Sequence, residues 1–169
     1  MNNLKYYIVN GKTVTRIGKA GSSSIAAAAY LSAKPMALVN GQLLSDNPSL
    51  LGAATYMSAA PSTNTPDDHP VMLVRDPVDR FLSALNEDGI EDIDTHLTQL
   101  ENDTYITKWT HFVPTVSYLN LTNKLFKFPD HMPELAAYLG VVELPNMNAS
   151  GVKATLTAEQ LSRVQAIYA

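Results

Sequence analysis

The sequence predicts an α/β domain in which a mainly parallel sheet carries helices on both faces. Two segments carry this prediction. Val71–Val74 is a short apolar run between prolines, typical of a buried strand, and Asp76–Pro77 then provides an N-cap and a first-turn proline for a helix. Thr13–Ile17 is a second strand pattern, and a Gly/Ser loop and an alanine-rich helix, Ala26 to about Ala33, follow it. Strands that alternate with helices build sheets of this kind.

Two hairpins and a loop are predicted from turn-forming residues. Because an Asn-Gly pair suits a type I′ turn, Leu4–Val9 and Lys12–Ile17 are expected to form a hairpin around Asn10–Gly11. Met36–Leu44 repeats this signal more weakly around a second Asn-Gly pair. Ala60–Pro70 is rich in proline, serine, threonine and aspartate, a composition that predicts a loop.

The second half of the chain contains two further helix signals. After a break at Gly89, apolar residues recur at the spacing of one helix face, and the charged residues between them form a solvated face. Thr157 and Gln160 have the spacing of a capping box, which predicts the start of the last helix. The apolar residues of the first of these helices are Ile90, Ile93, Leu97 and Leu100.

Length and composition limit the kind of protein this is. With 46% apolar and 17% charged residues the chain is globular, and its 169 residues fit a single domain, residues 1–169. No apolar run approaches the roughly 20 residues that span a bilayer, and the first residues lack a secretory-signal pattern. The net charge of −4 disfavours nucleic-acid partners. The sequence has no cysteine, and its histidines lack metal-site spacing, so no metal is expected.

Arg75 and Ser83 are candidate anion-binding residues. Arg75 follows the predicted strand, and Ser83 lies about two turns into the helix that comes next. Both are therefore expected near the carboxyl edge of the sheet, where open α/β sheets bind ligands. Arginine offers a planar fork of donors suited to phosphate or sulfate oxygens. By itself, however, Arg-Asp-Pro is also a common way to end a strand and begin a helix.

The Gly/Ser loop after Thr13–Ile17 is a second candidate anion site. Its sequence, Gly18–Ser24, places glycines and hydroxyls between a strand and a helix, where backbone N–H groups and the helix dipole converge on an oxyanion. A Walker A motif would need its lysine after the second glycine, but Lys19 precedes Gly21. Taken alone, the loop could also be a solvated turn that caps a helix.

The Gly/Ser loop precedes the Arg75 segment along the chain. In this chain order, the two segments resemble the phosphate-binding motifs of sulfotransferases that use PAPS (3′-phosphoadenosine 5′-phosphosulfate). The 3′-phosphate motif of that family has arginine, aspartate or asparagine, proline, and a serine eight positions after the arginine, as in Arg75–Ser83. The family's 5′-phosphosulfate loop is usually Pro-Lys-x-Gly-(Ser/Thr)-(Ser/Thr), and Gly18 stands here in place of the proline. The resemblance implies a three-layer, P-loop-like sulfotransferase fold with a mainly parallel central sheet.

A fainter resemblance to the carbohydrate-type branch of this family continues downstream. Trp109–Thr115 is similar to that branch's His-(Phe/Trp)-x-Pro-Gln segment, with threonine in place of glutamine. Further similar segments are a late strand at Lys124–Phe128, a helix at Pro133–Gly140, a loop at Leu144–Ser150 followed by Lys153, and a closing helix at Leu156–Tyr168. The resemblance implies a short bacterial or viral member of the family, without a Golgi anchor and located in the cytoplasm.

The resemblance also implies roles for single residues. Lys19 would meet the charge that develops on the leaving phosphate oxygen, and Arg75 and Ser83 would hold the 3′-phosphate. PAPS would be the sulfate donor, without metal, and the acceptor would be a hydroxyl of a small molecule or carbohydrate. The other expected cofactor-binding residues are Ala20, Gly21, Ser22, Ser23, Ser24 and Lys153.

The general base for the acceptor hydroxyl stays open at this point. His111 is the candidate by motif resemblance, although packing explains it equally well, and His69 is the second candidate. Two other functions also stay open. One is a non-catalytic protein of the same fold that binds PAP, PAPS or a protein partner. The other is a P-loop kinase or nucleotidase, which the order of Lys19 and Gly21 disfavours.

Overall fold

The computed structural model describes most of the chain, and every structural statement below concerns that part. Two predicted site residues, His69 and Lys153, lie outside it, as do residues 60–69 of the loop predicted at 60–70 and most of the loop predicted at 144–150. The described residues are 6–33, 38–39, 42–43, 70–102, 111–117, 124–145, 147 and 154–169.

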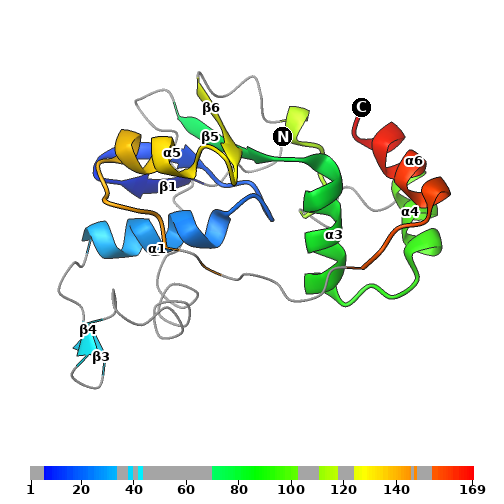
Figure 1. Ribbon diagram of the computed structural model, residues 1–169, viewed down its shortest axis with the longest axis horizontal. Coiled ribbons are helices and arrows are strands. Elements are labelled where there is room, and N and C mark those ends of the chain that lie inside the picture. Colours follow the sequence, from blue (N-terminus) through cyan, green and yellow to red (C-terminus); the bar gives the residue numbers. More distant parts are fainter. Residues whose placement is uncertain are drawn as a thin grey trace.

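Strands and helices alternate along much of the described chain (Figure 1). The strands are β1 (Tyr6–Val9), β2 (Lys12–Thr15), β3 (Leu38–Val39), β4 (Gln42–Leu43), β5 (Val71–Arg75) and β6 (Lys124–Phe128). The helices are α1 (Ser22–Ala33), α3 (Pro77–Asp88), α4 (Ile93–Glu101), α5 (Met132–Leu139) and α6 (Ala158–Ile167).

A mostly parallel sheet forms the centre of the fold, which confirms the predicted α/β class. Its order is β1-β2-β5-β6, in which β1 and β2 are antiparallel, while β5 is parallel to both β2 and β6. The hairpin turn has positive φ at both central residues, 47° at Asn10 and 77° at Gly11, as a type I′ turn requires. The weaker hairpin signal is also confirmed, because β3 and β4 pair as a short antiparallel ladder.

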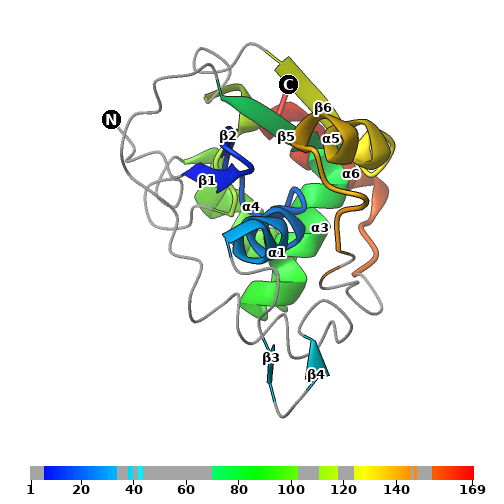
Figure 2. The ribbon, with the colours of Figure 1, turned by 90° about the vertical axis from the view of Figure 1, so that its left-hand side faces the viewer.

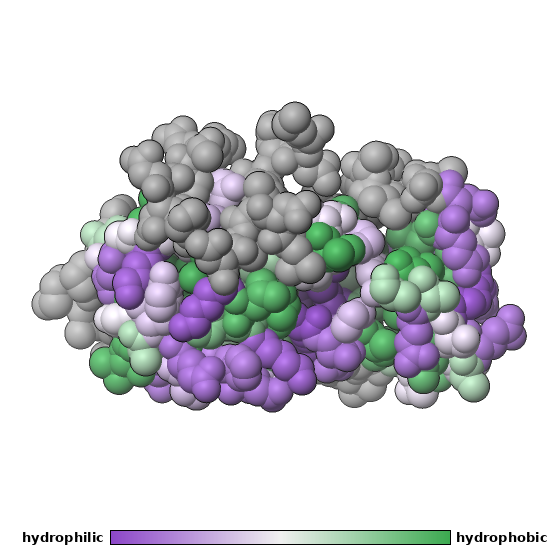
Figure 3. Space-filling view, turned by 90° about the horizontal axis from the view of Figure 1, so that it is seen from above, coloured by the Kyte–Doolittle hydropathy of each residue, from purple (hydrophilic) through white to green (hydrophobic). Residues whose placement is uncertain are grey.

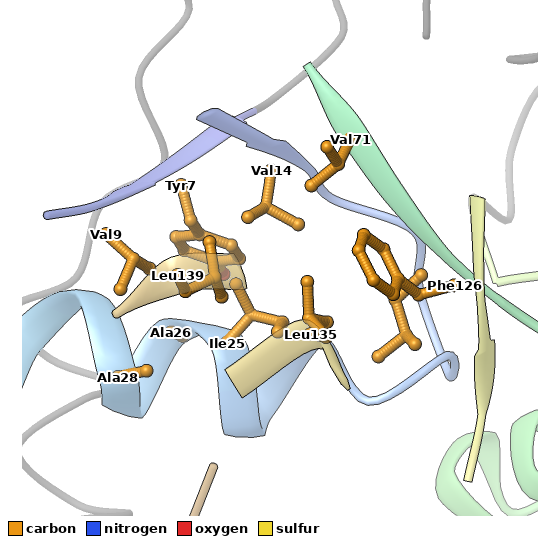
Figure 4. Close-up of a cluster of buried hydrophobic side chains, with 11 residues drawn as sticks. Tyr7, Val9, Val14, Ile25, Ala26, Ala28, Val71, Phe126, Leu135 and Leu139 are labelled. Atoms are coloured by element: carbon orange, nitrogen blue, oxygen red, sulfur yellow. The ribbon is translucent and has the colours of Figure 1, made fainter. Parts of the chain in front are cut away.

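Helices α1 and α5 pack on the same face of the sheet (Figures 2 and 4). Val71 and Leu73 of β5 face this helix layer, whereas Met72 and Val74 point to the other face, against Ile17 and Ala20. The helix–sheet cluster consists of Tyr7, Val9, Val14, Ile25, Ala26, Ala28, Val71, Leu73, Phe126, Leu135 and Leu139.

The described residues do not show the predicted helices on both faces. The strands β2, β5 and β6 are added in one direction across the sheet, an order that does not by itself require helices on the second face. Right-handed crossovers between strands added in one direction place their helices on one side, and a second layer requires a reversal of direction. No such reversal occurs among the strands of the described chain.

Helices α3, α4 and α6 form a second cluster with the segment 111–117, beside the carboxyl end of β5 (Figure 1). The predicted start of α3 is confirmed, since the Asp76 carboxylate accepts the N–H groups of Val78 and Asp79 and Pro77 opens the helix. The predicted break is also confirmed at Gly89, which ends α3. The buried members of the cluster are Phe81, Ala84, Leu85, Leu97, Leu100, Phe112 and Val164.

The outer side of this cluster is polar. The predicted capping box starts α6, and Arg163 on that helix pairs with Asp94 and Glu101 of α4. Seen from above in Figure 3, hydrophilic side chains gather along one long edge and at the end formed by α4 and α6. None of the described helices combines the length and apolar character needed to cross a membrane.

His96 gives this cluster a predicted dependence on pH. Burial lowers the pKa of His96 below its ordinary value, and the charge of Asp88 opposes this effect in part. The unfolded chain therefore binds a proton more readily than the folded chain, so stability is lost as pH falls below about 6.5. The free energy of unfolding, measured in urea from about pH 8 to pH 5, should fall more steeply for the wild type than for His96→Gln. Parallel curves would contradict this expectation.

Candidate functional site

The loop between β2 and α1 is the centre of the candidate site. Strand β2 ends at Thr15 instead of Ile17, and α1 begins at Ser22, so the prediction of a helix start at Ala26 was wrong. The first helical hydrogen bond runs from the Ile25 N–H to the Gly21 carbonyl. The serines predicted as loop residues therefore form the first helical turn, where backbone N–H groups have no partner within the helix. Such a turn favours anions.

Because Gly21 has no side chain, this loop packs closely against the sheet. Its φ is +74°, and a Cβ there would come within 2.8 Å of Leu73 Cδ2 and 3.1 Å of Phe128 Cδ2. A side chain at this position would meet both a strained backbone and the side chains of β5 and β6. Gly21 thus sets how closely the loop and the start of α1 approach the carboxyl ends of the two neighbouring strands.

Replacing Gly21 by alanine is expected to lower the free energy of unfolding by about 2–5 kcal/mol. A left-handed backbone costs a residue with a side chain about 1–2 kcal/mol, and overpacking a core costs about 1–3 kcal/mol. Gly11→Ala is the matched control, because Gly11 has φ +77° but a Cβ there would meet no described atom within 4 Å. Denaturation in urea should show a clearly smaller loss for the control. Equal losses would mean that the close contacts at Gly21 add nothing to the loss of unfolding free energy.

Arg75 and the loop lie together, as the sequence predicted. The Arg75 side chain leaves the end of β5, and its Nη1 donates a hydrogen bond to the Lys19 carbonyl at 3.2 Å. Its guanidinium carbon lies 5.1 Å from the centre of the Phe128 ring. Its Nε is buried and has no hydrogen-bond partner within the described residues. Arg75 therefore keeps donor capacity beside the loop.

Lys19 occupies a backbone conformation that glycine adopts more readily. Its φ is +63°, and positive φ is uncommon for residues other than glycine. The Lys19 ammonium forms an ion pair with Glu87 of α3, and the lysine side chain is 14% exposed. A positive φ at a residue with a side chain is a strained backbone state. In this structure the lysine side chain is held at the surface of α3.

His111 approaches the same loop from the segment 111–117. Its Nδ1 lies 3.1 and 3.2 Å from the two carboxylate oxygens of Asp88, and its Nε2 lies 3.8 Å from Glu87 Oε1. A Cβ at residue 18 would come within 2.9 Å of His111 Cδ2. A side chain at residue 18 would therefore displace the histidine ring, which explains the glycine at this position.

Arg80 joins the loop to the segment that carries His111. This side chain is 3% exposed, and its Nε donates to the Gly18 carbonyl at 2.9 Å, while Nη1 donates to the Val113 carbonyl at 2.7 Å. The Tyr168 hydroxyl donates to the neighbouring Phe112 carbonyl at 2.9 Å. The carbonyl of Phe112 is thus anchored to the residue that follows α6, and the carbonyl of Val113 is anchored to α3.

Sequence reasoning missed Arg80, Glu87 and Asp88. A signal existed, because Arg80, Ala84 and Glu87 recur at the spacing of one helix face. That spacing does not reveal that this face of α3 packs against the loop. The hydrogen bond from Arg80 to Gly18 joins residues 62 positions apart in the sequence. Within the described ranges, no cluster of three or more histidine or acidic side chains could hold a metal ion.

Two of the predicted hydroxyl ligands are buried. Ser83 is 6% exposed and Ser24 is 4% exposed, whereas Ser22 and Ser23 are partly exposed. Within the described residues Ser83 makes no hydrogen bond to Arg75. Ser83 lies six positions after Pro77 along α3, a rise of about 9 Å. Of the predicted residues, the structure therefore brings together Lys19, Ala20, Gly21, Arg75 and His111, with Ser22 at the start of α1.

Comparison of the chain with protein-family models, with curated proteins and with solved structures found no match.

Proposed function

We propose that the protein is a PAPS-dependent sulfotransferase that transfers a sulfuryl group to a hydroxyl of a small molecule, sugar or glycan. The observation that carries the proposal is the contact between its two motifs. Arg75, at the end of β5, donates to the Lys19 carbonyl at 3.2 Å, so the two candidate phosphate ligands lie at one edge of the sheet. A donor with two phosphate groups needs two such sites close to each other.

The residues at this edge fit an anionic ligand. The first-turn N–H groups of α1, the ammonium of Lys19 and the guanidinium of Arg75 supply donors and positive charge. The buried Nε of Arg75 has no partner in the described chain, and a ligand oxygen could satisfy it. These positive groups gather in a chain whose net charge is −4. Because Glu87 pairs with Lys19 and Asp88 contacts His111 beside the loop, Arg75 and the first-turn N–H groups are the donors that most directly support binding of an anion.

The chemistry is a displacement at sulfur. Bound PAPS supplies an electrophilic sulfur and a good leaving group, PAP. The acceptor oxygen forms a bond to sulfur, the bond from sulfur to the phosphate oxygen breaks, and PAP leaves with that electron pair. Lys19 neutralises the charge on the leaving oxygen, after its ammonium exchanges Glu87 for the ligand. His111 takes the proton of the acceptor hydroxyl at Nε2.

The fold that we propose is P-loop-like, with three layers. The order strand, Gly/Ser loop and helix in β2–α1, with β5 parallel and adjacent to β2, supports this assignment. The second helical layer would have to come from residues outside the described ranges. A cytoplasmic location and the absence of nucleic-acid and membrane partners belong to the same proposal.

A non-catalytic PAP-binding protein is the second candidate. The ion pair between Lys19 and Glu87 favours it, because a neutralised lysine contributes less to a leaving group. Labelled sulfate transfer from PAPS to a panel of alcohols, sugars and glycans separates the two candidates. The enzyme transfers label to at least one acceptor class and produces PAP in equal amount. Binding of PAP without transfer to any acceptor would contradict the enzyme and support the non-catalytic PAP-binding protein.

A further inference from the structure

Two adjacent acidic residues in the last turn of α3 contact Lys19 and His111, the two residues that act chemically in the proposed function. Glu87 pairs with Lys19, and Asp88 accepts from His111 Nδ1. The Asp88 side chain is 10% exposed, against 49% for Glu87, so the two carboxylates differ in environment. Asp88 is the more constrained of the two, because both its oxygens lie within 3.2 Å of one ring nitrogen.

We propose that Asp88 is a positioning residue. It holds the His111 ring with a proton on Nδ1, and it thereby leaves the lone pair of Nε2 available for the proton of the acceptor. The inference rests on the proposed sulfuryl transfer for its catalytic consequence. The assignment of the tautomer itself rests only on the contacts of the ring.

The tautomer follows from the chemistry of the two partners. An ionised carboxylate has no proton to give and can only accept, so Nδ1 at 3.1 Å from Asp88 must be the donor. In water a neutral imidazole favours the other tautomer, with its proton on Nε2. That form would point the lone pair of Nδ1 at the carboxylate and leave no acceptor at Nε2. Asp88 therefore reverses the intrinsic preference of the ring.

The surroundings of His111 fix the ring in place and put a carboxylate opposite Nε2. Gly18 lies against Cδ2, and Arg80 anchors the carbonyls of Gly18 and Val113. The charged groups that face the ring from the packed elements are Asp88 and Glu87 of α3, with Lys19 of the loop held by Glu87. A proton at Nε2 would face Glu87 Oε1, now 3.8 Å away, which stabilises the imidazolium that forms.

Nitrogen NMR of the full chain tests the tautomer directly. With ¹⁵N-labelled histidine, at a pH where the ring is neutral, the wild type should show a protonated Nδ1 and an unprotonated Nε2 at His111. Asp88→Ala should move the proton to Nε2. Glu134→Gln is the matched control, because Glu134 pairs with the exposed His131 at 3.6 Å and should leave the His111 signals unchanged. A wild-type Nε2–H tautomer, or an unchanged tautomer in Asp88→Ala, would overturn the proposal.

Kinetics test the consequence for turnover. Asp88→Ala should lower the turnover number at least about tenfold, while PAP affinity stays within threefold. Asp88→Glu restores the carboxylate and should recover part of the rate, and it replaces the alanine variant if that variant does not fold. Full activity of a folded Asp88→Ala would overturn the positioning role. A wild type that transfers no sulfate yet shows the Nδ1–H tautomer would refute the proposed function and keep the tautomer assignment.

Discussion

Lys19→Ala is expected to lower the rate of sulfate transfer by about 10²–10³-fold, the cost of one preorganised donor in comparable sites. The physical reason is that the ammonium meets charge that develops mainly in the transition state, so turnover suffers far more than nucleotide affinity. Affinity for PAP should stay within about tenfold of the wild type. Steady-state transfer of labelled sulfate and calorimetric titration with PAP measure the two quantities.

Lys127→Ala is the matched control for this variant. Lys127 also forms an ion pair, with Asp130, but both side chains of that pair are well exposed on the β6 side of the sheet. Its loss should leave transfer unchanged. Lys19→Gly adds a second comparison, because glycine accepts the φ of +63° without strain. If Lys19→Ala and Lys19→Gly transferred sulfate at the wild-type rate, Lys19 would have no part in the chemistry.

Arg75→Ala is expected to remove most of the preference for PAP over AMP. The two nucleotides differ in the 3′-phosphate, and a charged hydrogen bond contributes about 1.5–3 kcal/mol, equivalent to roughly a 10- to 100-fold difference in affinity. The ratio of the two dissociation constants is the appropriate readout. Arg75 also holds the Lys19 carbonyl, so its loss can loosen the loop and weaken both nucleotides together.

Arg75→Lys distinguishes charge from geometry at this position. Lysine keeps the positive charge but lacks the planar fork, so the preference for PAP should recover only in part. Arg163→Ala is the remote control, since Arg163 pairs with α4 residues on the surface. If Arg75→Ala kept the wild-type ratio of the dissociation constants for AMP and PAP, Arg75 would not be the residue that binds the 3′-phosphate.

Much of the fold could be predicted because its signals are local. Asp76–Pro77, Gly89 and the Asn10–Gly11 turn act on the backbone within a few residues, and each structure that they predict is present. The capping box at Thr157 works in the same way. The meeting of Arg75 with the loop was also predictable, because adjacent parallel strands bring their carboxyl ends to one edge.

The rest depends on contacts that no local pattern encodes. The pairing of Lys19 with Glu87 joins residues 68 positions apart, and it depends on which face of α3 packs against the loop. The start of α1 was predicted too late, because three serines have modest helix propensity and tertiary packing outweighed it. The second helical layer stays a prediction, because among the described residues helices pack on only one face of the sheet.

Calorimetric titration of the wild-type chain with PAP, and in parallel with AMP and ATP, tests the central claim most directly. The claim is that the loop at Lys19 and the guanidinium of Arg75 together form a site for a nucleotide with two phosphate-bearing positions. We predict that PAP binds roughly 10- to 100-fold more tightly than AMP, and more tightly than ATP. Equal affinity for PAP and AMP, or a preference for ATP, would contradict the claim.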